Sequence, residues 1–553
     1  MSDIHDLASA FVDETVERRP NLATYLGIPG HDDRWDDLSA AGAEAVAAME
    51  RDQLGRLRAL GTLDDEWERL ARRVISEELE GEIMMVDAGE HLLDLRSVAS
   101  PVQDLRDTFD HMDKATAEGW QNVMSRLRSL PEAITQFVSR LEEGRRRDRT
   151  VAERQVQAAI KQSRHHAGDE SSLLALVDEA RETGMTDDLV AAVAAAVDEG
   201  RRGYSELADH LEGTYLASAV ERDAVGPERH ALYAKHFLGT AIDPIATYEW
   251  GWDEVTRLRG RMEEIADSIS PGSSLAAAIE LLQTDPDRAA ASPEEFRDLM
   301  QERQEIALRE LEGVHFEVPQ AIRSVDVKLA PAGGPLGAYY VDPSEDFSRP
   351  GSIWWSLGDA RVIPLFNQVS TAYHEGFPGH HLQVGLQKSA GDRFTRYQRV
   401  MVWNSGTGEG WALYAEDLME ELGYLEKPDY VMGKLAGEML RACRVVIDIG
   451  SHHELPIPKG QPFHPGEPWT FDTGVEMLLT HAAEDPEVAE SEMTRYLGWP
   501  AQAIAYKVGQ QAIRDLRDQE RAKGDFDQKQ FHARLLEIGS TGLDVLRAHI
   551  AGS

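Results

Sequence analysis

The 553-residue sequence is poor in cysteine and in basic residues, and both shortages exclude classes of protein. Its single cysteine, Cys443, excludes an internal disulfide and a cysteine-based metal cluster, so a metal site must use histidine and carboxylate ligands. Lys and Arg total 57 against 98 Asp and Glu, which gives a formal net charge of −41. No basic stripe is available for phosphate contacts, so we expect no nucleic-acid partner. Composition assigns neither a role to this acidic surface nor an oligomeric state.

Long hydrophobic runs are also missing. No apolar stretch approaches the ~18 residues of a membrane span, and no basic segment followed by an apolar run stands at the N-terminus. We therefore expect a cytoplasmic protein with no membrane partner. The 42% hydrophobic content excludes a disordered chain, and the length leaves room for two or more lobes around a cleft.

Helical periodicity dominates the chain. Up to residue 239, apolar residues recur at i, i+3, i+4 and i+7, which predicts a helical scaffold lobe at 1–239 and a catalytic lobe at 240–553. In the catalytic lobe we expect metal-site helices at 370–453 and C-terminal helices at 470–553. The predicted fold is mainly α, a large multi-helix metallopeptidase-like architecture with a small β-sheet next to the active-site helix and a central cleft.

The sheet is predicted between residues 314 and 365, where Gly and Pro separate short β-rich runs. The runs are VHFEVP, VDVKLAPAGG, LGAYYVDPS, GSIWWSL and ARVIPLF. Ile353 to Leu357 is the candidate edge strand, on which an extended substrate could add as a further strand. The alternative is a hairpin that only supports the following helix.

The stretch STAYHEGFPGHHLQ, residues 370–383, concentrates a His-Glu pair and two further histidines. In H-E-x-x-H metalloproteases, two histidines at i and i+4 hold Zn²⁺ and the Glu acts as general base. Here His374 and Glu375 open that pattern, but position i+4 is a proline. The next histidines are His380 and His381, at i+6 and i+7, which a regular helix would not bring to one metal.

The helix must therefore bulge across GFPG, residues 376–379, where proline removes a hydrogen bond and glycine admits unusual dihedrals. This interpretation makes His380 the second ligand and His381 a group that faces the substrate or supports a ligand. The alternative is a polar helix break whose histidines are hydrogen-bonded in a core.

A third ligand is predicted after the glycine-rich NSGTGEG, at Glu409 near the start of a helix. Glu409 and Glu416 lie two turns apart on one face, so only one of them can reach a given metal. Glu416 and Tyr414 are candidates for supporting a ligand or binding substrate. The alternative for Glu409 is a glutamate that only stabilises the helix N-terminus.

Farther along, polar residues interrupt an apolar helix between residues 439 and 453. Arg441 or Arg444 could hold a substrate carboxylate, although an internal arginine–aspartate bridge would give the same pattern. Asp448 and His452 are candidates for orienting metal ligands. Tyr506 could donate its phenolic proton to an oxyanion, with a core tyrosine as the alternative.

These motifs resemble the DUF885 family of bacterial proteins, which are regarded as predicted metallopeptidases and carry an H-E-x-x-P-G-H-H-L-Q stretch. The resemblance spans nearly the whole chain. The matching stretches are PNLATYLG (20–27), HEGFPGHHLQ (374–383), GEGWALYAE (408–416), RACRVVIDIGSH (441–452), AQAIAYKVG (501–509) and GDFDQKQFHARLLEIGSTGLDVL (524–546).

More distantly, GEGWALY is similar to the N-E-G-F-A-x-Y stretch of zinc aminopeptidases, whose Glu binds zinc and corresponds to Glu409. PGHHL resembles the F-G-H-A-L of helical oligopeptidases and carboxypeptidases, whose zinc-binding His corresponds to His380. Those relatives lack the two-residue expansion, so His381 remains the alternative ligand. The resemblance implies a largely helical protein with a zinc site.

We therefore expect a zinc-dependent metallopeptidase or amide hydrolase, with another divalent metal as an alternative cofactor. His374, His380 and Glu409 would hold the metal, Glu375 would act as general base, and Tyr506 or His381 would stabilise the oxyanion. The substrate would be a peptide. Alternatives are an amidohydrolase of small-molecule amides and a catalytically inactive protein that binds peptides or metal.

Overall fold

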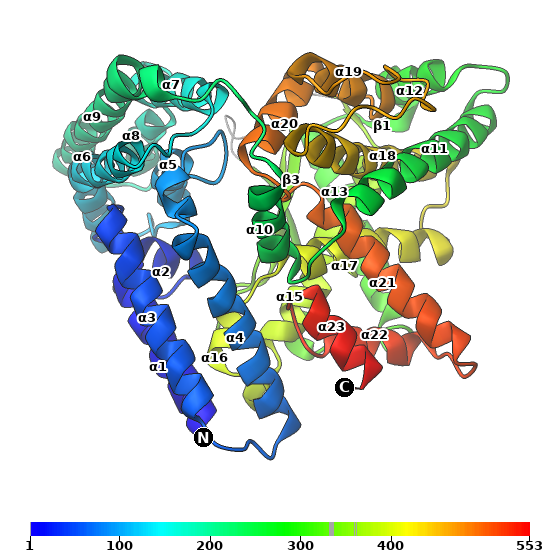
Figure 1. The fold of residues 1–553 in the computed structure, drawn as a ribbon, viewed down its shortest axis with the longest axis horizontal. Helices are drawn as coiled ribbons and strands as arrows, with labels where there is room; N and C mark the ends of the chain where they lie inside the picture. The colour runs from blue at the N-terminus through cyan, green and yellow to red at the C-terminus, as the bar shows by residue number, and fades with distance from the viewer. Residues whose placement is uncertain (1, 331–336, 359, 361, 553) are drawn as a thin grey trace. The chain divides into compact units, whose positions relative to one another are not determined.

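The computed structural model describes residues 2–330, 337–358, 360 and 362–552, and most of them are helical (Figure 1). The predicted mainly α fold with a small sheet is confirmed, and the central cleft stays a prediction. Two compact units form the chain. The first comprises Met1–Asp64, Glu78–Ala224 and Leu497–Trp499, and the second comprises Asp65–Glu77, Val225–Tyr496 and Pro500–Ser553.

The first unit is entirely helical in its named elements. Its helices are α1 (Asp3–Arg18), α2 (Pro20–Leu26), α3 (Ala40–Ala59), α5 (Pro101–His111), α6 (Ala117–Arg146), α7 (Glu153–Ala167), α8 (Ala175–Glu182) and α9 (Asp187–His210). Helix α4 (Glu66–Asp87) contributes residues to both units.

The pairing of α6 with α9 follows directly from hydrophobic spacing. Apolar residues of α6 recur at intervals of three and four from Trp120 to Leu141, and those on this face are at most 2% exposed. Burying each large side chain contributes roughly 1.5–3 kcal/mol. Thr116 caps the first turn of α6 by accepting the Gly119 N–H.

The second unit holds the sheet strands and the remaining helices. The helices are α10 (Pro227–Leu238), α11 (Pro244–Ile269), α12 (Leu275–Thr284), α13 (Pro293–Leu311), α14 (Gln368–Glu375), α15 (His380–Lys388), α16 (Arg396–Val400), α17 (Ser405–Glu421), α18 (Pro428–His452), α19 (Phe471–His481), α20 (Pro486–Gly498), α21 (Ala505–Ala522), α22 (Gln528–Leu536) and α23 (Leu543–Ala551). Residues 225–239, which we assigned to the first lobe, cluster with this unit because α10 packs on α17, α18 and α21.

Glycines allow α17 and α21 to cross in close contact. A Cβ added at Gly509 of α21 would lie 1.9 Å from the Gly406 carbonyl oxygen of α17. One added at Gly410 would lie 2.4 Å from the Gly509 carbonyl carbon. Any larger residue would force the backbones apart, so these glycines fix the position of Glu409 on α17.

The three-stranded sheet has the order β2–β4–β3, from strands β2 (Asp326–Leu329), β3 (Gly337–Val341) and β4 (Ser352–Ser356). It lies against α14, since the Trp355 indole N–H donates to Gln368 Oε1 over 3.0 Å. Strand β4 pairs in parallel with β2 and antiparallel with β3. The expectation that Ile353–Leu357 is an edge strand is therefore wrong.

Two of the predicted β runs do not contribute a strand to the three-stranded sheet. Residues 314–319 form no strand, and Phe316 packs instead against the rings of Phe377 and Trp411. In the last run, β5 (Ile363–Pro364) pairs with the separate β1 (Ala289–Ala290). Residues 331–336 and 361, parts of three predicted runs, lie outside the described residues.

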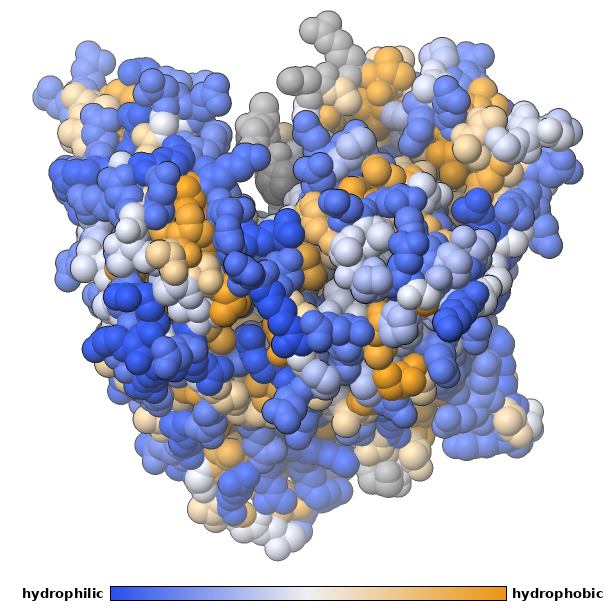
Figure 2. Space-filling model, turned by 45° about the horizontal axis from the view of Figure 1, so that its top comes forward, coloured by the Kyte–Doolittle hydropathy of each residue, from blue (hydrophilic) through white to orange (hydrophobic). Residues whose placement is uncertain are grey.

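None of the described helices is both long enough and apolar enough to cross a bilayer. On the face drawn in Figure 2, hydrophilic residues predominate and hydrophobic ones form scattered patches.

Candidate metal centre

A break between two helices produces the site. Helix α14 ends at Glu375 and α15 begins at His380, so residues 376–379 interrupt the helix where glycine and proline predicted it. A Cβ at Gly379 would lie 2.0 Å from the His374 carbonyl oxygen. Only glycine therefore lets the chain return close enough to place His380 beside His374.

Two side chains that sequence analysis missed satisfy the broken backbone. Gln304 of α13 donates to the Ala372 carbonyl oxygen over 2.8 Å and accepts the Phe377 N–H over 2.7 Å. The Trp411 indole N–H of α17 donates to the Pro378 carbonyl oxygen over 2.9 Å. These bonds replace the hydrogen bonds that a continuous helix would supply, so the break is a fixed structure.

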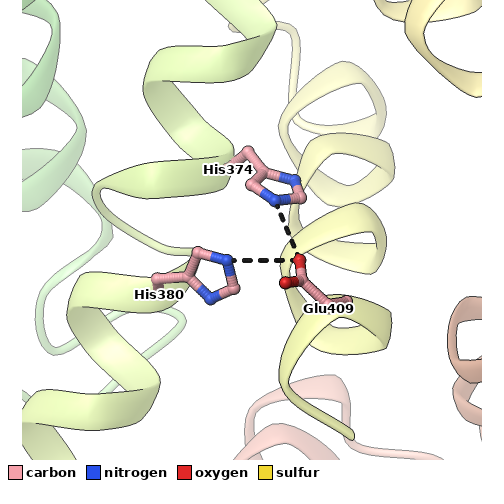
Figure 3. A group of neighbouring side chains, drawn as sticks. All are labelled: His374, His380 and Glu409. Atoms are coloured by element: carbon pink, nitrogen blue, oxygen red, sulfur yellow. Dashed lines mark ion pairs between the residues drawn. The ribbon is translucent and has the colours of Figure 1, made fainter. Parts of the chain in front are cut away.

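The break brings His374, His380 and Glu409 together (Figure 3). Nε2 of His374 lies 3.4 Å from Glu409 Oε2, and Nε2 of His380 lies 3.5 Å from the same oxygen. One ligand atom from each residue lies within 4.8 Å of the other two. We call these three residues the triad.

The two histidine–glutamate distances fit a tetrahedral ion. Two ligand atoms at ~2.0–2.1 Å from zinc and at a tetrahedral angle are about 3.4 Å apart. Direct hydrogen bonds would instead bring a ring nitrogen to about 2.7–3.2 Å from the oxygen. Two histidines and one glutamate are also a ligand set found in catalytic zinc sites.

Glu416 orients His374 from behind. His374 Nδ1 donates to Glu416 Oε1 over 2.9 Å, and Ser370 Oγ donates to Oε2 of the same carboxylate. A carboxylate can only accept, so Nδ1 of His374 carries a proton and Nε2 is the ring atom directed at Glu409. Sequence analysis identified Glu416 but missed Ser370, which precedes His374 by one helical turn.

His380 is oriented by ring packing. Its ring meets that of His374 edge to face at 4.8 Å between centroids, and that of Trp403 at 5.5 Å. Trp403 is 43% exposed, an unusual state for so large an apolar side chain. A Cβ at Gly408 would collide with the indole, so the glycine before Glu409 makes room for Trp403. No local pattern in the sequence indicated this residue.

The site combines charges in a largely buried environment. Burial lowers the pKa of His374, but the adjacent carboxylates of Glu409 and Glu416 outweigh it and raise the value to about 10. Burial raises the pKa of Glu409, but the adjacent imidazoles of His374 and His380 bring it well below its usual range. Burial raises the pKa of Glu375, whose Oε1 lies 4.0 Å from His374 Nε2. A raised carboxyl pKa suits a residue that takes and returns a proton.

His381 lies apart from the triad. Its Nδ1 is 3.0 Å from the Tyr340 hydroxyl, and its Nε2 is 2.9 Å from the Ile322 carbonyl oxygen. Burial lowers its pKa to about 4. With both ring nitrogens hydrogen-bonded, His381 is available neither as second ligand nor as oxyanion donor, which corrects those expectations.

The two arginines of α18 differ in their hydrogen-bond partners. Arg444 donates from Nε to the Tyr496 hydroxyl over 3.0 Å and from Nη2 to Glu492 over 2.7 Å, so an internal bridge occupies it. Arg441 donates from Nη1 to the Gly437 carbonyl oxygen over 3.0 Å. Only Arg441 keeps donors for a substrate.

Asp448 and His452 belong to a separate cluster. Asp448 Oδ1 lies 2.7 Å from His230 Nε2, and Oδ2 accepts the Ala501 N–H over 3.0 Å. His452 Nε2 lies 3.0 Å from the Tyr496 carbonyl oxygen. Neither residue touches a triad residue in the described part of the chain, so the expectation that they orient metal ligands is wrong.

The two candidate tyrosines, Tyr414 and Tyr506, lie in different surroundings. Tyr414 is fully buried, and its hydroxyl contacts His532 Nε2 at 2.9 Å and Arg517 at 3.3 Å, so it is not at the site. Tyr506 packs under the Arg444 guanidinium, 4.9 Å from the ring centroid. Burial raises its pKa, and the nearby charge of Glu409 raises it further. The oxyanion role of Tyr506 stays a prediction.

Fold and site together define a mainly α-helical protein with a candidate His–His–Glu metal centre. The family model of DUF885, bacterial proteins of unknown function, matches residues 20–550, and the chain belongs to that family. No curated protein matches the sequence.

Two solved structures share the fold over their full length. A provisionally assigned lipoprotein from Colwellia psychrerythraea matches with a TM-score of 0.86 and 22% identity, covering 99% of this chain and 98% of its own. A provisionally assigned lipoprotein of unknown function from Shewanella oneidensis matches with a TM-score of 0.73 and 17% identity, covering 100% of both chains. Both descriptions contradict the expected cytoplasmic location, which we withdraw.

Proposed function

We propose that this protein is a metal-dependent hydrolase, with zinc as the metal, that cleaves peptide or amide bonds. The observation that carries the proposal is the convergence beside Glu375 of three ligand atoms within 4.8 Å of one another, with both histidine–glutamate distances at tetrahedral spacing. The Glu416 hydrogen bond, which leaves Nε2 of His374 free for a metal, supports it.

In this proposal His374, His380 and Glu409 hold the ion. Zinc held there would supply Lewis acidity and lower the pKa of water toward ~7. Glu375 takes a proton from the attacking water and delivers it to the leaving nitrogen. Water is consumed, the C–N bond breaks, and the products are a carboxylate and an amine. Tyr506 is the candidate donor of a hydrogen bond to the oxyanion.

Metal content tests the proposal independently of any substrate. We expect elemental analysis of the purified protein to find bound zinc, to find it lost in His380→Ala and to find it retained in His381→Ala. Both variants remove a buried imidazole from the same helix, so each controls for general damage. Equal zinc content in the two variants would sink the ligand assignment.

A further inference from the structure

Arg441 is partly buried and makes no ion pair with the residues that the structure describes. Among the described residues, no carboxylate oxygen lies within 4.0 Å of its guanidinium nitrogens, and its buried Nε has no hydrogen-bond partner. Such an arginine is unexpected in a chain with 98 acidic and 57 basic residues. Arg444, one turn farther along α18, has the acidic partner that Arg441 lacks. Arg441 is therefore free to bind an external anion.

A pocket of about 150 Å³ lies against Arg441. Helices α12, α14, α17 and α18 and residues 482–484 line it, all within the second unit. The polar residues Gln283 and Asn367 also line it. A cavity of this volume accommodates a benzene-sized group, which is the scale of one amino-acid side chain.

The pocket adjoins the triad through Glu416 and Ser370. Both residues line it, and Glu416 also accepts the hydrogen bond from His374 Nδ1. Glu416 therefore lies between the pocket and His374, so one carboxylate separates a group bound by Arg441 from the triad.

We infer that this pocket, here called the Arg441 pocket, binds the free carboxylate of a short substrate. The enzyme would then hydrolyse the amide bond near the carboxylate end of a peptide, or an N-acylated amino acid. A guanidinium presents a planar fork of donors that matches a carboxylate. This inference rests on the proposed function and adds a substrate class to it.

Glu484 also lines the pocket and restricts which C-terminal residues of a substrate fit there. Its carboxyl group disfavours a second negative charge on the terminal residue, so terminal Asp or Glu is expected to be a poor fit. Neutral and basic terminal residues are favoured. The Glu484→Gln variant is expected to relax this discrimination without changing the need for a terminal carboxylate.

The first experiment compares acetyl-Ala-Ala with its C-terminal amide. The wild-type kcat/KM is expected to favour the free acid roughly 10- to 100-fold, as for a hydrogen-bonded charge pair. In Arg441→Gln this preference should fall to about 1 because hydrolysis of the acid slows much more than hydrolysis of the amide. Arg441→Lys should retain part of it, and Arg297→Gln, an exposed arginine on α13, is the matched control.

Two results would contradict the assignment of Arg441 as the residue that binds the carboxylate. An Arg441→Gln variant that slows both substrates equally would mean that Arg441 has only a structural role. A wild-type enzyme that treats acid and amide alike would overturn the inference.

A second experiment needs no turnover. Metal-free protein is titrated calorimetrically with acetylglycine and with acetylglycinamide. We expect the wild type to bind only the acid and Arg441→Gln to bind neither. If no substrate is hydrolysed but this difference remains, the proposed hydrolase fails and the carboxylate pocket stands. If hydrolysis occurs but neither compound binds, the pocket assignment fails alone.

Discussion

The second unit contains two buried clusters of histidine and carboxylate that differ in what their nitrogen atoms contact. In the triad, both Nε2 atoms face one Glu409 oxygen at 3.4 and 3.5 Å. In the other cluster, here called the Asp448 cluster, His230 lies between two short contacts. Its Nε2 is 2.7 Å from Asp448, and its Nδ1 is 3.0 Å from Nε2 of His453.

Histidines beside a carboxylate therefore do not by themselves make a metal site. The Asp448 cluster uses its lone pairs and protons to join α10, α18 and the turn at Ala501. The triad leaves ligand atoms at a spacing that suits an ion, and Glu416 fixes the ring that presents one of them. The comparison therefore predicts chemistry from the triad and stability from the Asp448 cluster.

The largest expected effect comes from Glu375→Gln, which keeps the side-chain shape but removes the proton acceptor. We expect hydrolysis to fall by roughly 10²–10⁴-fold while zinc remains bound, since general acid–base catalysis contributes about that much. Activity and metal content are measured on the same preparation. Wild-type activity in this variant would show that Glu375 is not the base.

Asp448→Asn should lower the stability of the fold and leave the zinc content unchanged. The buried carboxylate accepts hydrogen bonds from His230 and the Ala501 backbone, and a neutral amide cannot replace both well. We expect the free energy of unfolding to fall by about 2–4 kcal/mol, with zinc content unchanged below the transition. Denaturant unfolding followed by elemental analysis of the folded fraction checks this. Zinc loss without loss of stability would reverse the assignment of the two clusters.

Glu416→Gln tests how the triad is oriented. An amide can still accept from His374 Nδ1, but it lacks the charge that makes the imidazole a stronger ligand. We expect zinc affinity to decrease by roughly 10- to 100-fold, measured by competition with a chelator. Glu421→Gln is the matched control on the same helix, because Glu421 pairs with Arg517 instead. An unchanged affinity in Glu416→Gln would argue against its support of the ligand.

The sequence was most informative where the cause is local. Helical periodicity predicted the mainly α fold, and the Gly and Pro of residues 376–379 predicted the break that separates His374 from His380. Glu409 was identifiable because it follows a glycine-rich helix start. Each of these three predictions depends only on residues that are close together in the sequence.

Sequence reasoning failed where the partner lies far along the chain. The polar residues of α18 share one side of a helix, but spacing does not reveal which neighbours that side meets. Arg444 and Asp448 therefore resembled functional groups, although Glu492 and His230 bind them. Gln304 gave no signal because it lies in an ordinary amphipathic helix. The central position of β4 likewise depends on pairing with strands on both sides.

The smallest expected effect is the pH dependence that His453 gives to the Asp448 cluster. Burial and the neighbouring His230 and His452 lower the pKa of His453, Asp448 opposes them, and the resulting value is about 4. An unfolded histidine titrates near 6.5, so between pH 6.5 and 4 the unfolded chain binds the proton more readily. The contribution of His453 to stability is therefore complete above pH 6.5 and is lost as the pH falls toward 4.

We expect the melting temperature of His453→Gln to fall less steeply than that of the wild type between pH 6.5 and 4.5. His464→Gln is a control of opposite sign, because hydrogen bonds with Glu476 and Glu467 raise the pKa of His464. Parallel curves for wild type and His453→Gln would show that this imidazole is not held neutral by the cluster.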